Sequence, residues 1–398
     1  MRVAHFARFV PNLSGQYATV KDLIKAEIQQ GIDAGFIAIQ SGPGFEGGAG
    51  MARQDDWMKT KKMDWAESAD IIVRHVSVPS KFVYSGKQPK LMCLHGRPEN
   101  SFLLGVYSPN DVYNTVFCEK KTWDNFVTFW PEFVFHWTKL LGEESHRLNY
   151  VPAMVDLETF SPEGERRDFA ENSGSPNIVI ADQWREDTTP YNVLHAALYF
   201  RDYYCPTAAI HVYGIRKHRA MLNLVRRLRG PGYLGQTKGA CNRMEQTFRA
   251  ADIVVTPHVI ATRIIRETMA CGTPLVAGGG CSYTSYNADP RNTELSAGEI
   301  NKCWQDIKTN PQLGKDFRIR AEKEFSLEQT GKAMVKLFER MLDERAKKPE
   351  IDISVAKREN SRAERRRQEK KKLKQLQQKN MQQIKQFYKQ RAIAGKGR

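Results

Sequence analysis

The segment formed by residues 250–277 constrains the fold most, because an apolar strand, a helix and a second apolar strand follow one another there. Residues 253–255 form the short apolar run that is typical of a buried parallel strand. A helix is expected to begin near Thr262 and to end at Gly272, since Pro274 prevents its continuation. The start of that helix exposes unpaired N–H groups beside the carboxyl end of a strand, where open α/β sheets bind phosphorylated ligands.

Strand and helix signals alternate in the same way over most of the chain, which predicts an α/β fold with two doubly wound parallel sheets. A length of 398 residues favours two or more domains, and 41% hydrophobic residues suffice for sizeable cores. The predicted units are a first Rossmann-like domain (1–160), a polar linker (161–176), a second Rossmann-like domain (177–325), a closing helix (326–348) and a basic tail (349–398).

Several classes of protein are disfavoured by composition. No stretch approaches the roughly 20 apolar residues of a membrane span, and the chain begins directly with a strand, so a cytoplasmic protein is expected. The seven cysteines form no C-x-x-C pair, which indicates neither a zinc cage nor a disulfide framework. Residues 42–47 satisfy G-x-G-x-x-G, but they follow the second strand and contain Pro43, so we interpret them as a loop.

The positive charge is concentrated at the carboxyl end of the chain. Residues 356–398 carry sixteen Lys/Arg and three Glu, whereas the other 355 residues have a net charge of only +3. This tail has high helix propensity but too few apolar residues for its own core. An anionic polymer such as DNA or an anionic membrane surface is its natural partner, and an unstructured tail without a specific role is the alternative. The residues expected to contact nucleic acid are Arg365, Arg366, Arg367, Lys370, Lys371 and Lys372.

The segment around Glu267 resembles the donor-site signature of GT-B retaining glycosyltransferases (the family 4-like group), in which a glutamate holds the ribose of a sugar nucleotide. Four further parts of the chain resemble the same enzymes in the same order. They are the opening strand, loop and helix (1–8, 12–16 and 21–30), two strands (69–75 and 90–96), the junction between the domains (149–160) and the closing helices (310–326). The resemblance implies two Rossmann-like domains facing across a cleft. It also implies a nucleoside-diphosphate sugar as co-substrate, with no further cofactor.

The resemblance assigns roles to individual residues. His95 follows an apolar strand and corresponds to a catalytic histidine beside the transferred sugar, although a strand-end histidine bonded to a backbone carbonyl is the structural alternative. His75 ends a similar strand, and we interpret it as structural. The residues expected to bind the donor are Gly15, Gln16, Arg185, His258, Thr262, Arg263 and Glu267.

The chain also departs from the family pattern. Val259 stands where a second glutamate contacts the donor sugar, and Gln183 and Thr188 stand where an Arg and a Lys neutralise the diphosphate. Arg185 is a candidate to replace them, because its planar fork suits a phosphate. No D-x-D occurs, so a metal-independent site is expected.

Three functions remain open for such a chain. The first is a retaining glycosyltransferase acting on a hydroxyl, with hydroxymethylated pyrimidine in DNA as the candidate acceptor, as in phage-type DNA-modifying enzymes. The second is a polysaccharide or glycolipid transferase at an anionic membrane surface. The third is a noncatalytic nucleic-acid-binding protein on a degenerate scaffold, suggested by Val259, Gln183 and Thr188. Ten aromatic residues between Tyr107 and Trp137 could stack on sugars or bases, but packing is favoured.

Overall fold

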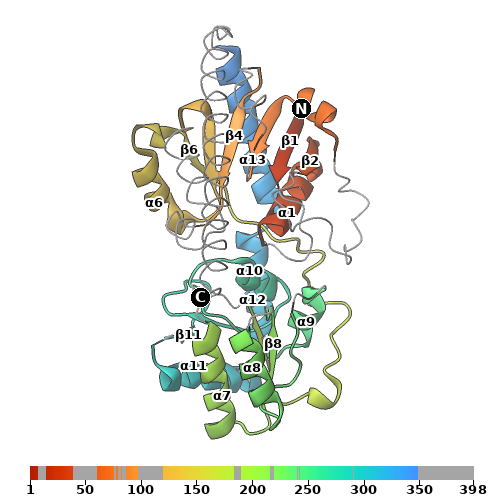
Figure 1. The fold of residues 1–398 in the computed structure, drawn as a ribbon, viewed down its shortest axis with the longest axis vertical. Coiled ribbons are helices and arrows are strands. Elements are labelled where there is room, and N and C mark those ends of the chain that lie inside the picture. The colour runs from red at the N-terminus through yellow and green to blue at the C-terminus, as the bar shows by residue number, and fades with distance from the viewer. Residues whose placement is uncertain are drawn as a thin grey trace, which may run out of the picture. The chain divides into compact units, whose positions relative to one another are not determined.

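The computed structural model is built around two parallel β-sheets with flanking helices (Figure 1). The structure describes residues 1–7, 15–38, 61–75, 78, 82, 87–96, 120–182, 190–215, 219–239, 241, 243–289 and 291–347. Two compact units can be separated in the chain. Residues 1–78 and 89–345 form the first, and residues 79–88 and 346–398, which lie almost wholly outside the described residues, form the second.

The N-terminal sheet has six strands in the order β2-β1-β3-β4-β5-β6, all paired in parallel. These strands are β1 (Arg2–Ala7), β2 (Asp33–Ala38), β3 (Ile71–Arg74), β4 (Lys90–Leu94), β5 (Asn125–Thr128) and β6 (Leu148–Tyr150). The helices of this part are α1 (Gly15–Gln29), α2 (Met63–Glu67) and α6 (Pro131–Leu141). β3, β4 and β5 are buried along their whole length, as expected for strands covered on both faces.

The C-terminal sheet has five strands in the order β11-β10-β9-β7-β8, again parallel. Its strands are β7 (Asn177–Ala181), β8 (Ala209–Tyr213), β9 (Ile253–Val255), β10 (Leu275–Gly278) and β11 (Asn287–Ala288). The helices that follow them in sequence are α7 (Pro190–Tyr203), α8 (Arg219–Arg229), α9 (Met244–Ala250), α10 (Arg263–Ala270), α11 (Thr293–Thr309), α12 (Leu313–Glu324) and α13 (Leu327–Ala346). One buried hydrophobic cluster joins these strands and the helices α7 to α12.

The last helix, α13, contacts residues of the N-terminal part. Thr330 donates a hydrogen bond to the carbonyl of Pro152 at 3.0 Å. Gly331 packs so closely on α1 that an added Cβ would lie 2.5 Å from the carbonyl oxygen of Ala26. The predicted closing helix therefore exists as a helix and touches α1, while the boundaries of the predicted domains stay predictions.

Three other sequence expectations concern composition and packing. Trp123, Trp130 and Trp137 are all buried, in agreement with the packing interpretation. The six cysteines that the structure describes are free thiols. Within the described part of the chain, no helix combines the length and the apolar character that crossing a membrane requires.

Candidate functional site

The β9–α10–β10 segment forms as the sequence predicts. Thr262 stands at the N-cap of α10 with extended backbone angles, and Gly272 follows the helix with a φ of 66°. This positive φ, together with a carbonyl oxygen of Gly314 only 3.2 Å from where a Cβ would lie, explains the glycine. The helix start therefore points its unpaired N–H groups and positive dipole end toward the carboxyl edge of the sheet.

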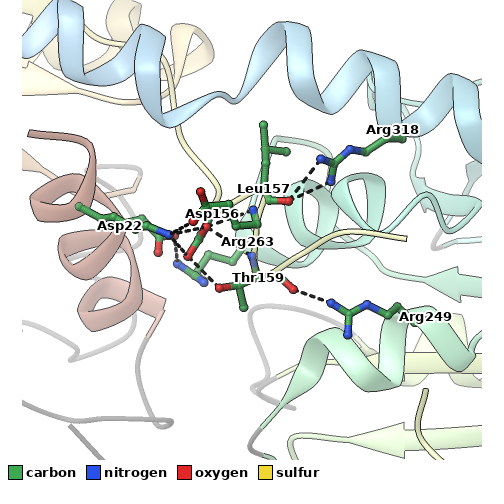
Figure 2. Close-up of polar contacts among 9 residues, drawn as sticks. Asp22, Asp156, Leu157, Thr159, Arg249, Arg263 and Arg318 are labelled. Carbon is green, nitrogen blue, oxygen red and sulfur yellow. Dashed lines mark hydrogen bonds and ion pairs between the residues drawn. The ribbon is translucent and has the colours of Figure 1, made fainter. Parts of the chain in front are cut away.

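Glu267 is buried in the second turn of α10, with 7% of its surface exposed. It pairs with Arg263, one helical turn earlier. Arg263 also binds Asp22 of α1, with Nη1 2.8 Å from the carboxylate oxygen (Figure 2). One guanidinium thus joins the predicted ribose-binding carboxylate to the first helix of the N-terminal part.

Burial controls the charges of this group. Burial raises the pKa of the Glu267 carboxyl; the charge of Arg263 opposes this rise, and the charge of Asp22 adds to it. Burial likewise raises the pKa of Asp22. Asp22 and Glu267 share the guanidinium of Arg263. This one cation therefore offsets the cost of burying the two ionised carboxylates only in part.

Arg266 is a site residue that sequence reasoning missed. Its side chain is 1% exposed, and none of its three guanidinium nitrogens has a hydrogen-bond partner among the described residues. Burial and the charge of Arg263 lower the pKa of Arg266 to about 10, so the side chain is a cation at neutral pH. The hydroxyl of Thr262 is also buried and without a partner in the described part of the chain. Two arginines three residues apart just before Glu267 were the available signal.

The carboxyl edge of the C-terminal sheet brings His258 near Asp182. Asp182 follows β7, His258 follows β9, and His258 Nε2 lies 3.1 Å from the carboxylate of Asp182. The backbone N–H of Gly278, at the end of β10, donates a hydrogen bond to the carbonyl of His258 at 2.9 Å. A Cβ at Gly278 would lie 2.9 Å from a methyl of Val259, which takes the place of the family glutamate. His258 thus lies at this edge of the sheet, next to Val259.

Gly15 and Gln16 begin α1. A Cβ added at Gly15 would meet the side chain of Arg263 at 3.7 Å, an ordinary contact, so the described residues impose no steric need for glycine there. Gln16 donates a hydrogen bond from its side-chain amide to the carbonyl of His75 at 2.8 Å. Both residues, which were predicted to bind the sugar-nucleotide donor, therefore lie at the start of α1. Gly15 lies near Arg263, and Gln16 lies near the end of β3.

His95 belongs to a chain of hydrogen-bonded side chains in the N-terminal sheet. His75 Nδ1 lies 2.9 Å from His95 Nε2, His5 Nδ1 lies 3.0 Å from His75 Nε2, and His5 Nε2 lies 2.7 Å from a carboxylate oxygen of Glu27. We call this set the buried relay: Glu27 of α1, His5 of β1, His75 after β3 and His95 after β4. His95 is thus bonded to a second histidine instead of a backbone carbonyl.

His75, interpreted from the sequence as structural, is the link between His5 and His95 in this chain of hydrogen bonds. The pairing of β1 with β3 and of β3 with β4 places the three histidines side by side. The sequence contains the signal, since each histidine lies within or just after an apolar strand. The order of strands in the sheet, which shows that they are neighbours, comes only from the fold.

The segment after β6 is held by long basic side chains. Lys25 binds the carboxylate of Asp156 at 2.9 Å, and Arg249 donates to the carbonyl of Thr159 at 2.7 Å (Figure 2). Arg318 donates to the carbonyls of Leu157, Phe160 and Ala270 at 3.3, 2.7 and 2.6 Å. These contacts tie the junction that follows the N-terminal sheet to α1, α9 and α12.

Several predicted site residues lie outside the described residues. They are Arg185 with its neighbours Gln183 and Thr188, and the tail residues Arg365, Arg366, Arg367, Lys370, Lys371 and Lys372. Among the residues that the structure describes, no group of three or more His, Cys, Asp and Glu side chains is arranged to hold a metal ion.

Comparison with known proteins defines the fold. No known family and no curated protein matches the chain. Among solved structures, HepE of Anabaena in complex with UDP and glucose is 12% identical with a TM-score of 0.60, over 85% of this chain and 99% of its own. A glycosyltransferase from Rickettsia africae is 14% identical with a TM-score of 0.63, over 86% and 98%. A sucrose-phosphate synthase from Thermosynechococcus elongatus is 15% identical with a TM-score of 0.61, over 86% and 99%.

The predicted GT-B fold is thereby confirmed: the chain has the architecture of GT-B glycosyltransferases, with two parallel sheets and flanking helices.

Proposed function

We propose that this protein is a glycosyltransferase that moves a sugar from a nucleoside diphosphate to a hydroxyl acceptor. The observation that carries the proposal is the buried carboxylate of Glu267 on α10, directly behind a helix start that faces the carboxyl edge of a parallel sheet. HepE, which shares the fold, was solved with UDP and glucose. In this chain the carboxylate of Glu267 is suited to a ribose hydroxyl pair, which a carboxylate binds through charge-assisted hydrogen bonds.

We further propose that transfer proceeds with retention and without a metal ion. Negative charge grows on the departing diphosphate, and preorganised donors in a site that excludes water stabilise it. The N–H groups at the start of α10 and the cationic side chains of Arg263 and Arg266 are the candidate donors on this helix, with Arg185 as the sequence candidate. The guanidinium of Arg266 has no hydrogen-bond partner among the described residues, which supports this assignment, because a buried cation without a hydrogen bond is costly unless an anion meets it.

For the acceptor we propose hydroxymethylated pyrimidine in DNA. The support is the tail, in which residues 356–398 have a net charge of +13. Such a segment binds a phosphate backbone by releasing counterions, while the target base is turned out of the duplex.

Mass spectrometry tests the transfer directly. The protein is incubated with a panel of nucleoside-diphosphate sugars and with plain DNA, hydroxymethylated DNA or anionic glycolipid vesicles. The expected result is a mass increase of one sugar residue on hydroxymethylated DNA alone. Sugar on the glycolipid would contradict the DNA acceptor, and no transfer or donor hydrolysis with any pair would contradict a catalytic role.

Deletion of residues 356–398 tests the tail. We expect weaker binding to duplex DNA and a smaller dependence of affinity on salt, since fewer counterions are released. Donor hydrolysis should persist, because the deleted residues lie outside the donor-binding helix. An unchanged salt dependence would contradict the role of the tail.

A further inference from the structure

We infer that the buried relay takes up the proton of the acceptor hydroxyl during transfer, with His95 receiving it and Glu27 holding it. The inference deepens the proposed glycosyl transfer and rests on it. In these terms His95 is the catalytic residue, and the other three members are positioning residues that act through it.

The hydrogen bonds of the relay run in one direction. In the proposed starting state Glu27 is a carboxylate, which can only accept, so His5 Nε2 carries the hydrogen of the 2.7 Å bond. With its one hydrogen on Nε2, His5 has a lone pair on Nδ1, which accepts from His75 Nε2 at 3.0 Å. His75 Nδ1 in turn accepts from His95 Nε2 at 2.9 Å. One carboxylate therefore sets the tautomer of all three rings, and His95 Nδ1 is left as a hydrogen-bond acceptor.

The surroundings keep the rings of His75 and His95 neutral, as this direction requires. Glu27 and His5 are fully buried and His75 is 3% exposed. Burial lowers the pKa of His75 well below its usual range, with the neighbouring rings of His95 and His5 adding to the effect. Burial also lowers the pKa of His95 to about 4. Cys93 of β4, the other titratable group close to Glu27, stays a neutral thiol because burial and the charge of Glu27 raise its pKa well above the usual value.

Both ends of the relay have an unused hydrogen-bonding atom. His95 Nδ1 is buried and has no partner among the residues that the structure describes. The second carboxylate oxygen of Glu27 is in the same condition. Buried polar atoms are nearly always paired, so an unpaired one calls for an explanation. A donor hydroxyl on the ligand satisfies the outer end, and a proton gained by Glu27 removes the uncompensated charge at the inner end.

The transfer step balances in atoms and electrons. On the face from which the diphosphate departs, the acceptor oxygen uses one electron pair to form the new bond to the anomeric carbon. The bond between that carbon and the diphosphate oxygen breaks with its pair on the diphosphate, so the configuration is retained. The O–H proton passes to His95 Nδ1, and the Nε2 proton of His95 passes to His75 Nδ1. The Nε2 proton of His75 then passes to His5 Nδ1, and that of His5 to Glu27.

After the step Glu27 is a neutral carboxylic acid, and every ring is neutral in the other tautomer. No buried imidazolium persists, which is an advantage because burial strongly disfavours charged imidazole. The reverse shift releases the proton to water when the product has left.

Nitrogen NMR of the full-length protein with ¹⁵N-labelled histidine tests the direction without any substrate. We expect His5, His75 and His95 to be neutral at pH 7.5, with hydrogen on Nε2 and none on Nδ1. Loss of single signals in His5→Gln, His75→Gln and His95→Gln assigns the three rings. Hydrogen on Nδ1 of His95 would overturn the inference, because that atom could not then accept a proton.

Kinetics of Glu27→Gln test the uptake of the proton. The glutamine carbonyl still accepts from His5 Nε2, so the tautomers stay, but the amide cannot hold the proton. We expect kcat for transfer to fall on the order of 100-fold with KM unchanged, as for loss of general-base catalysis. His211→Gln, at a buried histidine of β8 outside the relay, is the matched control and should leave kcat unchanged.

The outcomes separate the relay from the proposed function. Full transfer activity in Glu27→Gln would overturn the relay while glycosyl transfer stands. Absence of transfer in the unmodified protein would overturn the proposed function itself.

Discussion

The two sheets of this protein each bury a histidine network, and the networks end differently. In the C-terminal sheet, the ring of His211 accepts from the backbone N–H of Gln236 at 3.0 Å and lies 3.2 Å from the side-chain oxygen of Asn177. Both ring nitrogens are thus used within the protein. In the N-terminal sheet, the relay ends at His95 Nδ1, which no described residue contacts by a hydrogen bond.

The same contrast separates two arginines. Arg318 uses its guanidinium on three backbone carbonyls and on Glu322. Arg266, more deeply buried, uses none of its nitrogens among the described residues. A polar side chain with all its hydrogen bonds made inside the protein contributes to stability, whereas one with an unused donor or acceptor atom is available to a ligand.

The largest expected effect concerns His211, whose two ring nitrogens are both hydrogen-bonded within the protein, and the stability of the protein in acid. Burial lowers the pKa of His211 to about 4. As the pH falls from 6.5, this histidine is therefore protonated in the unfolded chain before it is protonated in the folded protein. Stability is therefore full above pH 6.5 and falls by about 3 kcal/mol for this group as the pH drops to 4. We expect His211→Gln to lose less stability over that range than the unmodified protein, as measured by urea unfolding at both pH values.

His146, an exposed histidine, is the control for this experiment. His146→Gln should keep the acid dependence of the unmodified protein. An equal loss of stability in His211→Gln and the unmodified protein would show that the neutral ring of His211 does not cause the acid dependence of stability.

The next effect concerns Glu267, which is paired with Arg263 in the structure. Glu267→Gln is expected to weaken donor binding by roughly 2 kcal/mol, about 30-fold in Kd, because a charge-assisted hydrogen bond to the ribose is lost. Calorimetric titration with the donor found by mass spectrometry measures it. Glu322→Gln, which removes an i,i+4 pair with Arg318, should bind donor normally. Unchanged donor affinity in Glu267→Gln would place the donor elsewhere.

The smallest effect concerns Arg266. A buried guanidinium without partners costs stability, so Arg266→Met is expected to raise the free energy of unfolding by about 1 kcal/mol while donor affinity falls. Arg318→Met is the matched control and should lower stability, because three carbonyls lose their donor. If Arg266→Met gained stability and kept full donor affinity, the guanidinium of Arg266 would not mark a ligand site.

Much of the fold could be predicted from local patterns. The apolar run 253–255, the N-cap at Thr262 and the stop at Gly272 each appear in the structure where they were expected. These features depend on neighbours within a few residues, so the sequence shows them directly. The positions of Glu267 and His258 beside the carboxyl edge of the C-terminal sheet follow from the same patterns.

The partners of these side chains could not be predicted in this way. Asp22 and Arg263 are separated by 241 residues, and their ion pair exists only because α1 and α10 approach each other. The partners of His75 could not be predicted for the same reason, since His5 and His95 come from other strands.

The sequence by itself determined the alternation of strands and helices, the helix start before Glu267 and the concentration of positive charge in the tail. These properties depend on periodicity, capping and composition, which are local. Only the tertiary structure decided the order of strands, the contacts among the members of the buried relay and the lack of a hydrogen-bond partner for Arg266 among the described residues. Hydrogen bonds between distant segments and exclusion from water arise when the chain packs, because both depend on which surfaces meet.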